Sequence, residues 1–319
     1  MRAFGIEAYG ACPRLMEVPA RAPGEGEISL AIKACGLNFA DLLMAEGKYQ
    51  ERPEPPVILG MEVAGEVLEI GPGVDGIRQG TQVVLFAGSG GLAETGCFPA
   101  ERAATLPKGM PFTDAAGFQV AYGTSHVALS HRARLAPGET LVVLGAAGGV
   151  GLTAVEIGKL MGARVIAVAR GAERLAVAKA AGADHLIDSE GSDLRAELKA
   201  LGGADVVYDP VGGVPFEAAF RAARPEARIL TIGFASGEVP QIKANHLLVK
   251  NLTVMGLYWG GYLAFRPEVV RESLATLFGW YAEGRIRPHV SHVLPLERAG
   301  EALALMRERK ATGKVVVTI

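Results

Sequence analysis

Glycines and alanines follow a short apolar run in the segment LVVLGAAGGVG, residues 141–151. The apolar run 141–144 is typical of a strand buried on both faces of a parallel sheet, and a helical pattern follows it through Met161. Gly148 leaves room for a pyrophosphate to approach the backbone, and Gly151 lets the helix pack close to the strand. Free N–H groups at the helix N-terminus then bind phosphate without a side-chain charge. The predicted phosphate-binding residues are Ala146, Ala147, Gly148, Gly149 and Val150.

Two arginines stand where a dinucleotide-binding unit grips the adenosine ribose. That place lies about 20 residues past the turn, at the end of the next strand, and an acidic residue there is typical of NAD binding. Here the strand RVIAVA ends at Ala169, Arg170 follows it, and Arg174 comes one helical turn later. A pair of cations suits the 2′-phosphate of NADP. We therefore expect NADPH as the cofactor, with solvated surface arginines as the alternative.

Alternating strand and helix patterns surround this turn. Such an alternation predicts a doubly wound parallel sheet, and six strands make it complete. The expected strands are 141–144, 164–169, 185–188, 205–209, 228–233 and 252–257, and the expected helices are 150–161, 173–181, 193–201, 214–223 and a shorter piece near Asn245, with Gly162, Gly182 and Gly202 as C-terminal stops.

The sequence patterns at the two ends of the chain differ from this alternation of strands and helices. Before Pro111, short β-like runs separated by Gly and Pro predict a twisted β domain, interrupted by one helix over 39–45. After Leu257 come two helical patterns, 267–283 and 296–309. The closing strand KVVVTI, 314–319, is expected to return to the first domain.

Length and composition set limits on the function. The chain has 319 residues, enough for two domains, and 50% of them are hydrophobic. A net charge of −2 argues against a nucleic-acid partner. The N-terminus lacks the apolar core of a signal peptide, and no apolar run approaches the roughly 20 residues of a membrane span, so a soluble cytoplasmic protein is expected. The three cysteines indicate neither a disulfide framework nor a metal knuckle.

Several longer motifs, in a consistent order, resemble those of one family. The chain is similar to zinc-independent medium-chain dehydrogenases/reductases of the NADPH:quinone oxidoreductase group, and the resemblance covers essentially its whole length. The motifs are GLNFADLL (36–43), ILGMEVAGEV (58–67), FQVAYGTSHVAL (118–129), GAAGGVG (145–151), DPVGG (209–213), IGFASGEVP (232–240), LYWGGY (257–262) and GKVVVTI (313–319).

The resemblance implies a domain organisation and a partner. It implies a GroES-like, mostly β catalytic domain over residues 1–115 and 259–319, and a Rossmann NADP-binding domain over 116–258. It also implies a homodimer in which the edge strand, 252–258, pairs with its symmetry mate.

Zinc ligands are missing where relatives that oxidise alcohols have them. Those relatives hold catalytic zinc with a Cys near the first helix and a His in a GHE motif, and this chain has Asn38 and Met61 there. An amide and a thioether do not replace a thiolate and an imidazole on Zn²⁺, so no metal site is expected. Without a Lewis acid to stabilise an alkoxide, reduction of an electron-poor acceptor is the favoured reaction.

Three residues are catalytic candidates on this resemblance. Asn38 is similar to a family residue that contacts the nicotinamide ribose or amide, and Asp41 follows it at NxxD spacing. Asn and Asp are also common helix caps, which is the alternative for both. Tyr49 matches a family tyrosine that could hydrogen-bond an acceptor carbonyl or donate a proton, with a packing role as the alternative. Leu43 stands where quinone reductases often carry a second tyrosine, which makes the site more apolar.

Further cofactor contacts are implied at the ends of strands. Thr124 corresponds to a family residue near the nicotinamide, although its hydroxyl could instead bond its own helix. Loops at the carboxyl edge of a parallel sheet bind ligands, and Phe234 could equally belong to the core. The residues expected there are Gly212, Gly233, Phe234, Ala235 and Tyr258, the last with an interface role as the alternative.

The predicted function is metal-free reduction of quinones or α,β-unsaturated carbonyls by hydride transfer from NADPH. A reductase of enoyl thioesters is the alternative within the enzyme class. The alternative from another class is an NADPH-binding protein with little turnover and a structural or regulatory role.

Overall fold

The chain divides between Val120 and Ala121, and again between Arg287 and Pro288, into two units in the computed structural model, which describes residues 1–319. The first unit holds 1–120 and 288–319, and the second holds 121–287. Residues 259–287 thus lie with the nucleotide-binding fold and not with the β-rich unit, which differs from the expected division at 258. The cause is local packing, because Trp259 fills the space beside Gly123 and the Trp280 ring meets His126 edge-on at 5.3 Å.

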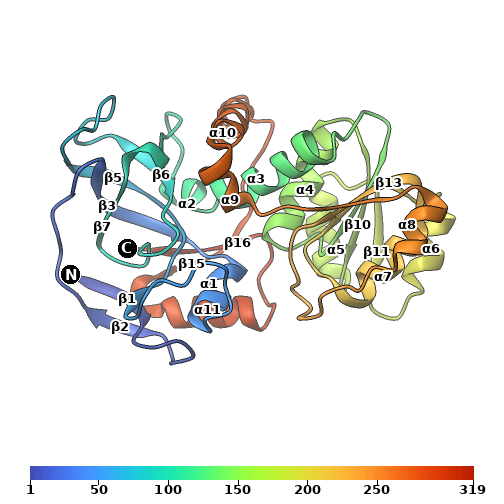
Figure 1. Ribbon diagram of the computed structural model, residues 1–319, viewed down its shortest axis with the longest axis horizontal. Helices are drawn as coiled ribbons and strands as arrows, with labels where there is room; N and C mark the ends of the chain where they lie inside the picture. Colours follow the sequence, from blue (N-terminus) through green and yellow to red (C-terminus); the bar gives the residue numbers. More distant parts are fainter. The chain divides into compact units, whose positions relative to one another are not determined.

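Six parallel strands form the sheet of the second unit, in the order β11-β10-β9-β12-β13-β14 (Figure 1). Numbered along the unit, this is the 3-2-1-4-5-6 order of a Rossmann fold, so the predicted fold class is confirmed. The strands are β9 (Thr140–Leu144), β10 (Arg164–Ala169), β11 (His185–Asp188), β12 (Ala204–Asp209), β13 (Ala223–Thr231) and β14 (Thr253–Gly256).

Helices connect these strands and cover the sheet. Four predicted helices are present to within one residue at each end, and the shorter piece expected near Asn245 is α8. Gly162, Gly182 and Gly202 each have a positive φ just past a helix end. The sequence did not predict the short helix α9. The helices are α3 (Gln119–His126), the π-helical segment η2 (Val127–Arg132), α4 (Gly149–Leu160), α5 (Ala172–Ala180), α6 (Leu194–Ala200), α7 (Gly213–Ala222), α8 (Ala244–Lys250), α9 (Trp259–Phe265) and α10 (Pro267–Ala282).

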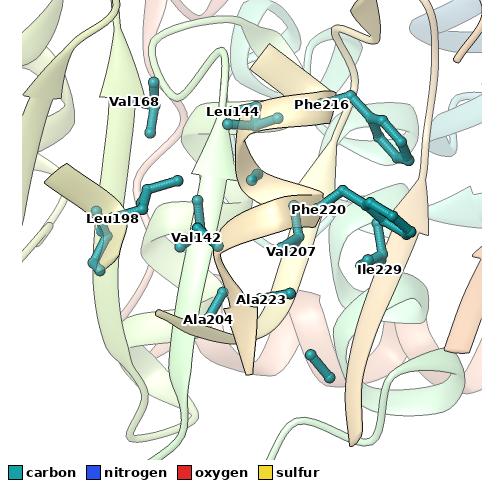
Figure 2. Close-up of a cluster of buried hydrophobic side chains, with 14 of the residues drawn as sticks. Val142, Leu144, Val168, Leu198, Ala204, Val207, Phe216, Phe220, Ala223 and Ile229 are labelled. Atoms are coloured by element: carbon teal, nitrogen blue, oxygen red, sulfur yellow. The ribbon is translucent and has the colours of Figure 1, made fainter. Parts of the chain in front are cut away.

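An apolar cluster between sheet and helices holds the Rossmann unit together. Phe216 and Phe220 of α7 stack with ring centroids 5.7 Å apart, and Figure 2 shows them beside Val207 and Ile229 of the sheet. Each fully buried aromatic side chain of this kind contributes about 2 kcal/mol to stability. The strand ends are thereby fixed relative to one another, which positions the loops that follow them.

The first unit is mostly β, as predicted. Its larger sheet has the order β15-β16-β3-β5-β6-β8, with β7 also paired to β3, and a smaller sheet has the order β2-β1-β4. The closing strand β16 pairs with β3, which confirms that the chain returns to its first domain. The elements are β1 (Arg2–Ile6), β2 (Arg14–Glu17), β3 (Glu27–Gly36), α1 (Phe39–Ala45), β4 (Val57–Ile58), β5 (Glu62–Ile70), β6 (Gln82–Phe86), β7 (Thr95–Pro99), η1 (Ala100–Arg102), β8 (Ala103–Thr105), α2 (Phe112–Ala116), β15 (Val290–Pro295), η3 (Leu296–Arg298), α11 (Ala299–Arg307) and β16 (Lys314–Thr318).

None of the helices combines the length and the apolar character that a membrane span requires.

Candidate active site and cofactor-binding residues

The glycine-rich turn joins β9 to α4 in the second unit. Gly145 has a φ of +61°, and a Cβ on Gly151 would lie 2.2 Å from the Gly145 carbonyl oxygen. Only glycine fits at position 151 without moving the turn, which is the close packing that the sequence predicted. Gly148 is the N-cap of α4, so the N–H groups of the following residues begin the helix without carbonyl partners inside it. The turn therefore presents backbone donors and the positive end of a helix dipole.

Hydrogen bonds fix the turn to its neighbours. The N–H of Ala146 donates to the Val168 carbonyl of β10 at 3.0 Å. On the other side, the Ser125 hydroxyl of α3 donates to the Val150 carbonyl at 2.9 Å and lies 2.9 Å from the Tyr208 hydroxyl of β12. Thr124, the predicted nicotinamide contact, is buried next to Ser125. The Ser125 hydroxyl of α3 is thus hydrogen-bonded to the first turn of α4.

The end of β10 carries the predicted ribose-binding arginines. Arg170 is exposed, Gly171 has a φ of +75° and caps α5, and Arg174 is half-buried in the first turn of that helix. No acidic residue ends β10 itself, but Asp188 of the neighbouring strand β11 lies opposite Ala169 in the sheet. Its carboxylate accepts the N–H groups of Gly171 and Glu190, each at 3.0 Å, and these bonds lower its pKa. Asp188 therefore holds the turn that presents Arg170.

The loops after β12 and β13 are bonded to each other. Ala235 donates its N–H to the Pro210 carbonyl at 3.0 Å, and Ser236 donates to Val211 at 2.9 Å. Gly212 has a φ of +72°, and a Cβ there would lie 2.5 Å from the Glu238 carbonyl oxygen. These two loops therefore form one ledge at the carboxyl edge of the sheet.

A buried carboxylate supports that ledge. Asp209, at the end of β12, accepts the N–H groups of Val211 and Gly212 at 2.8 and 2.9 Å. Burial raises its pKa to about 6. Gly233 follows β13, while Phe234 and Tyr258 are partly exposed. The predicted cofactor residues of this unit thus all follow the carboxyl ends of its strands, except Thr124.

A second set of polar groups lies in the first unit, around the N-terminus of α1. We call Asn38, Glu62 and Lys314 the Asn38 cluster. The Lys314 ammonium donates to a Glu62 carboxylate oxygen and, at 2.8 Å, to the Asn38 amide oxygen. The Asn38 amide nitrogen donates to the same Glu62 oxygen at 3.1 Å. Glu62 and Lys314 are 0% and 5% exposed, and the sequence analysis did not identify either.

The Asp41 carboxylate is buried in the first unit and accepts backbone N–H groups. It is 0% exposed, and its two oxygens accept the N–H groups of Asn38 at 2.7 Å and of Gly60 at 3.1 Å. Burial raises its pKa to about 7, and the two backbone bonds oppose that rise. The structure thus gives Asp41 a positioning role, as the cap of α1 and an anchor for the Gly60 loop, in place of the catalytic role expected from the sequence. Tyr49 lies half-buried in the bend after α1.

The chemistry of the donors around Asn38 does not suit a transition metal. Met61 is buried, the Asn38 amide oxygen and one Glu62 oxygen are already bonded to the Lys314 ammonium, and the other Glu62 oxygen accepts the Val120 N–H. A second cation beside that ammonium would be repelled. The residues of the second unit do fit a dinucleotide phosphate, because the Gly145–Gly151 turn offers backbone donors and has no acidic side chain within it.

Both family models that match the chain belong to dehydrogenases. Residues 24–108 match the alcohol dehydrogenase GroES-like domain, and residues 149–278 match the zinc-binding dehydrogenase domain. Quinone oxidoreductase-like protein 2 homolog of Nematostella vectensis is 38% identical, over 92% of this chain and 82% of the relative. The synaptic vesicle membrane protein VAT-1 homolog of Homo sapiens is 33% identical, over 93% of this chain and 80% of the relative.

A solved structure is similar over its entire length. Escherichia coli quinone oxidoreductase, crystallised with NADPH, superposes with a TM-score of 0.93 and 29% identity, covering 100% of both chains. The fold, the relatives and the donor set around Asn38 lead to one assignment. The chain belongs to the zinc-independent, quinone oxidoreductase-like medium-chain dehydrogenases/reductases and is an enzyme of that family.

Proposed function

We propose that this protein reduces quinones or α,β-unsaturated carbonyls with NADPH, by metal-free hydride transfer. The observation that carries the proposal is the Lys314 ammonium bonded to Asn38 and Glu62, since the resemblance places zinc ligands of metal-dependent relatives at Asn38 and at Met61, next to Glu62. An acceptor that is already electron-poor needs no Lewis acid to take a hydride. The bound nicotinamide supplies that hydride, and the protein's contribution is binding and orientation.

The second unit binds the cofactor in this proposal. The N–H groups at the start of α4 hold the pyrophosphate, and Arg170 and Arg174 hold the 2′-phosphate. The ledge containing Gly212, Gly233 and Phe234, together with Thr124 and Tyr258, encloses the rest of the dinucleotide. The E. coli relative, which contains NADPH, supports this cofactor.

The first unit supplies the groups that orient the acceptor. Asn38 presents an amide held by two charged neighbours, and Tyr49 donates a hydrogen bond to the acceptor oxygen. Such a contact requires about 3 Å between the tyrosine hydroxyl and that oxygen, or one bridging water. Leu43 keeps the surroundings apolar and so favours acceptors without a charge next to the reacting carbon.

A panel of acceptors tests the proposal. NADPH oxidation is followed by absorbance with quinones, enones and enoyl thioesters, and NADPH binding is measured in parallel by cofactor fluorescence. We expect turnover with quinones or enones and little with enoyl thioesters. Faster turnover of enoyl thioesters would replace the proposed substrate class. Tight NADPH binding with no turnover on the whole panel would overturn the enzyme assignment.

That last outcome corresponds to a second candidate function, an NADPH-binding protein with little turnover. The name of one relative, a synaptic vesicle membrane protein, states no reaction. The acceptor panel separates the two candidates directly. The binding measurement matters because an unfolded preparation would fail both assays, whereas a non-enzymatic NADPH-binding protein fails only the turnover assay.

We also propose that two copies of the chain pair through β14. This strand is bonded to β13 on one side only, and it is the last in the sheet. Leu257 donates its N–H to Thr231 of β13, so by alternation the N–H of Val254 faces away from β13. Light scattering after size exclusion is expected to give twice the chain mass, and Val254→Pro, which removes an outward donor, is expected to give a monomer. A monomeric wild-type protein would contradict this proposal.

A further inference from the structure

The two charged members of the Asn38 cluster are buried, Asn38 itself is half-buried, and the three residues come from distant parts of the chain. Asn38 precedes α1, Glu62 begins β5 and Lys314 begins β16. Glu62 uses both of its oxygens: one accepts from Lys314 and Asn38, and the other accepts the Val120 N–H of α3 at 2.9 Å. The Glu62 carboxylate therefore links its own strand to three other segments of the first unit, which carry Asn38, Val120 and Lys314.

Two glycines make room for the cluster. A Cβ on Gly36 would lie 2.0 Å from the Ala116 carbonyl oxygen and 2.9 Å from a Glu62 oxygen. A Cβ on Gly117 would lie 3.3 Å from the Lys314 Cβ and Cγ. The lysine stem therefore passes closely along the backbone at Gly117, and its ammonium group has little freedom to leave Glu62 and Asn38.

Hydrogen-bond chemistry gives the Asn38 amide one orientation. An ammonium group has only donors, so it must face the amide oxygen, and a carboxylate has only acceptors, so it must face the amide nitrogen. A flipped amide would place oxygen against carboxylate and NH₂ against ammonium, and both bonds would be lost. The second amide N–H is engaged only by the Gly36 carbonyl, at 3.5 Å, which is the limit of a hydrogen bond.

We propose that Glu62 and Lys314 are positioning residues that hold the Asn38 amide with one N–H directed to an oxygen of the bound ligand. The ligand group is a carbonyl or ribose oxygen, since the remaining amide donor can serve only an acceptor. This proposal rests on the proposed function for the identity of the ligand. The orientation itself is a property of the protein alone.

The orientation is tested first without any ligand. Side-chain amide signals of Asn38 are recorded by ¹H–¹⁵N NMR and assigned by their absence in Asn38→Ala. In the wild-type protein we expect two widely separated proton signals that exchange slowly with water. In the double variant Glu62→Gln/Lys314→Met, which removes both charges together so that neither remains buried alone, we expect the two signals to approach each other and exchange at least tenfold faster.

A matched control removes an ion pair elsewhere. Arg228 and Glu139 form a half-buried salt bridge in the Rossmann unit. Arg228→Met is expected to leave the Asn38 amide signals unchanged. Lys314→Arg, which retains a cation opposite Glu62, is expected to retain slow exchange in part. Unchanged Asn38 exchange in the double variant would overturn the positioning proposal.

A double-mutant cycle then tests the connection to turnover. If Lys314 and Glu62 act through Asn38, their double variant should lower kcat about tenfold or more when Asn38 is present, and less than about twofold in an Asn38→Ala background. The NADPH Kd is measured by fluorescence in each variant, so that a loss of cofactor binding is separated from a loss of kcat. Equal losses of kcat in both backgrounds would overturn the proposal, because a merely structural role would not depend on Asn38. Silence of the wild-type protein on the acceptor panel would overturn the proposed function instead, because the NMR result requires no turnover.

Discussion

The turn between β9 and α4 and the Asn38 cluster present polar groups by different means. The turn uses backbone N–H groups within seven consecutive residues, Gly145–Gly151, and contains no charged side chain. The cluster uses two buried charges, and Glu62 and Lys314 are 252 residues apart in the chain. The turn therefore depends on the shape of the backbone, whereas the cluster depends on a balance of charge.

Each of the two units also contains a buried carboxylate that accepts two backbone N–H groups and fixes a loop. These are Asp41, for the segment before α1, and Asp209, for the loop after β12. Burial raises the pKa of both, to about 7 and about 6. The Asn38 cluster differs from both in that a cation, Lys314, is buried together with its carboxylate, Glu62.

The largest effect is expected from breaking the charge balance. Lys314→Met leaves the Glu62 carboxylate buried without its cation, which should lower the free energy of unfolding by about 3–5 kcal/mol. Adding Glu62→Gln removes the second charge and should restore all but about 1–2 kcal/mol. Urea denaturation of the three proteins measures both values. A single variant as stable as the wild-type protein would show that the charge of Lys314 is not what the cluster depends on.

Local patterns account for what the sequence predicted well. The helix over 39–45 has the predicted ends, because Asn38 and Asp41 cap it with local bonds. The strand, glycine turn and helix at 140–160 follow from one continuous pattern. Helix α9 was missed because Gly260 and Gly261 and several aromatic residues give it a low helix propensity, and packing against α3 and α10 stabilises it instead.

Long-range pairing accounts for what the sequence did not predict. Glu62 and Lys314 each begin an apolar strand, where a charged residue rarely becomes buried without a partner. That is the signal that could have identified them as a pair. The sequence alone does not specify the partner, because the register of β3 with β5 and β16 decides it.

A pH titration of stability compares the two buried carboxylates. Because the folded pKa of Asp41 is raised to about 7 from an ordinary value of 3.8, the folded protein binds more protons than the unfolded chain between these pH values. The contribution of Asp41 to the free energy of unfolding is therefore complete below pH 4. It falls by roughly 2–4 kcal/mol as the pH rises through 7.

The contribution of His126 to stability changes with pH in the opposite direction, because burial lowers the pKa of its imidazole to about 4. The measured quantity is therefore the difference between the wild-type protein and Asp41→Asn in thermal melts from pH 4 to 8. Asp209→Asn is the matched variant, and its difference in stability from the wild-type protein should stop changing with pH above about pH 6. A difference for Asp41→Asn that does not vary with pH would contradict the assignment.

The turn should be sensitive to shape and not to charge. Gly151→Ala places a Cβ 2.2 Å from the Gly145 carbonyl oxygen, so the turn must shift. We expect a loss of about 2 kcal/mol in stability and a rise of at least about tenfold in the NADPH Kd. Gly279→Ala in α10, where nothing lies within 4 Å of the added Cβ, is the control and should be neutral or slightly stabilising. An unchanged Kd in Gly151→Ala would show that the turn does not bind the phosphates.

The smallest effect is expected at the end of β10, where the turn region does use side-chain charge. Arg170 is exposed and follows Ala169, so its replacement should leave the fold intact. Arg170→Asp removes a cation from the 2′-phosphate of NADPH and places a carboxylate where it can accept a ribose hydroxyl. The ratio of kcat/KM for NADPH to that for NADH should fall about tenfold to thirtyfold, because a charge-assisted hydrogen bond contributes about 1.5–2 kcal/mol.

Arg195→Asp, which alters an arginine of α6 not predicted to bind cofactor, is the matched control and should leave the ratio unchanged. If the wild-type enzyme preferred NADH, or if both variants shifted the ratio equally, the arginine at position 170 would be a solvated surface charge, and cofactor selection would have to come from the backbone of the turn alone.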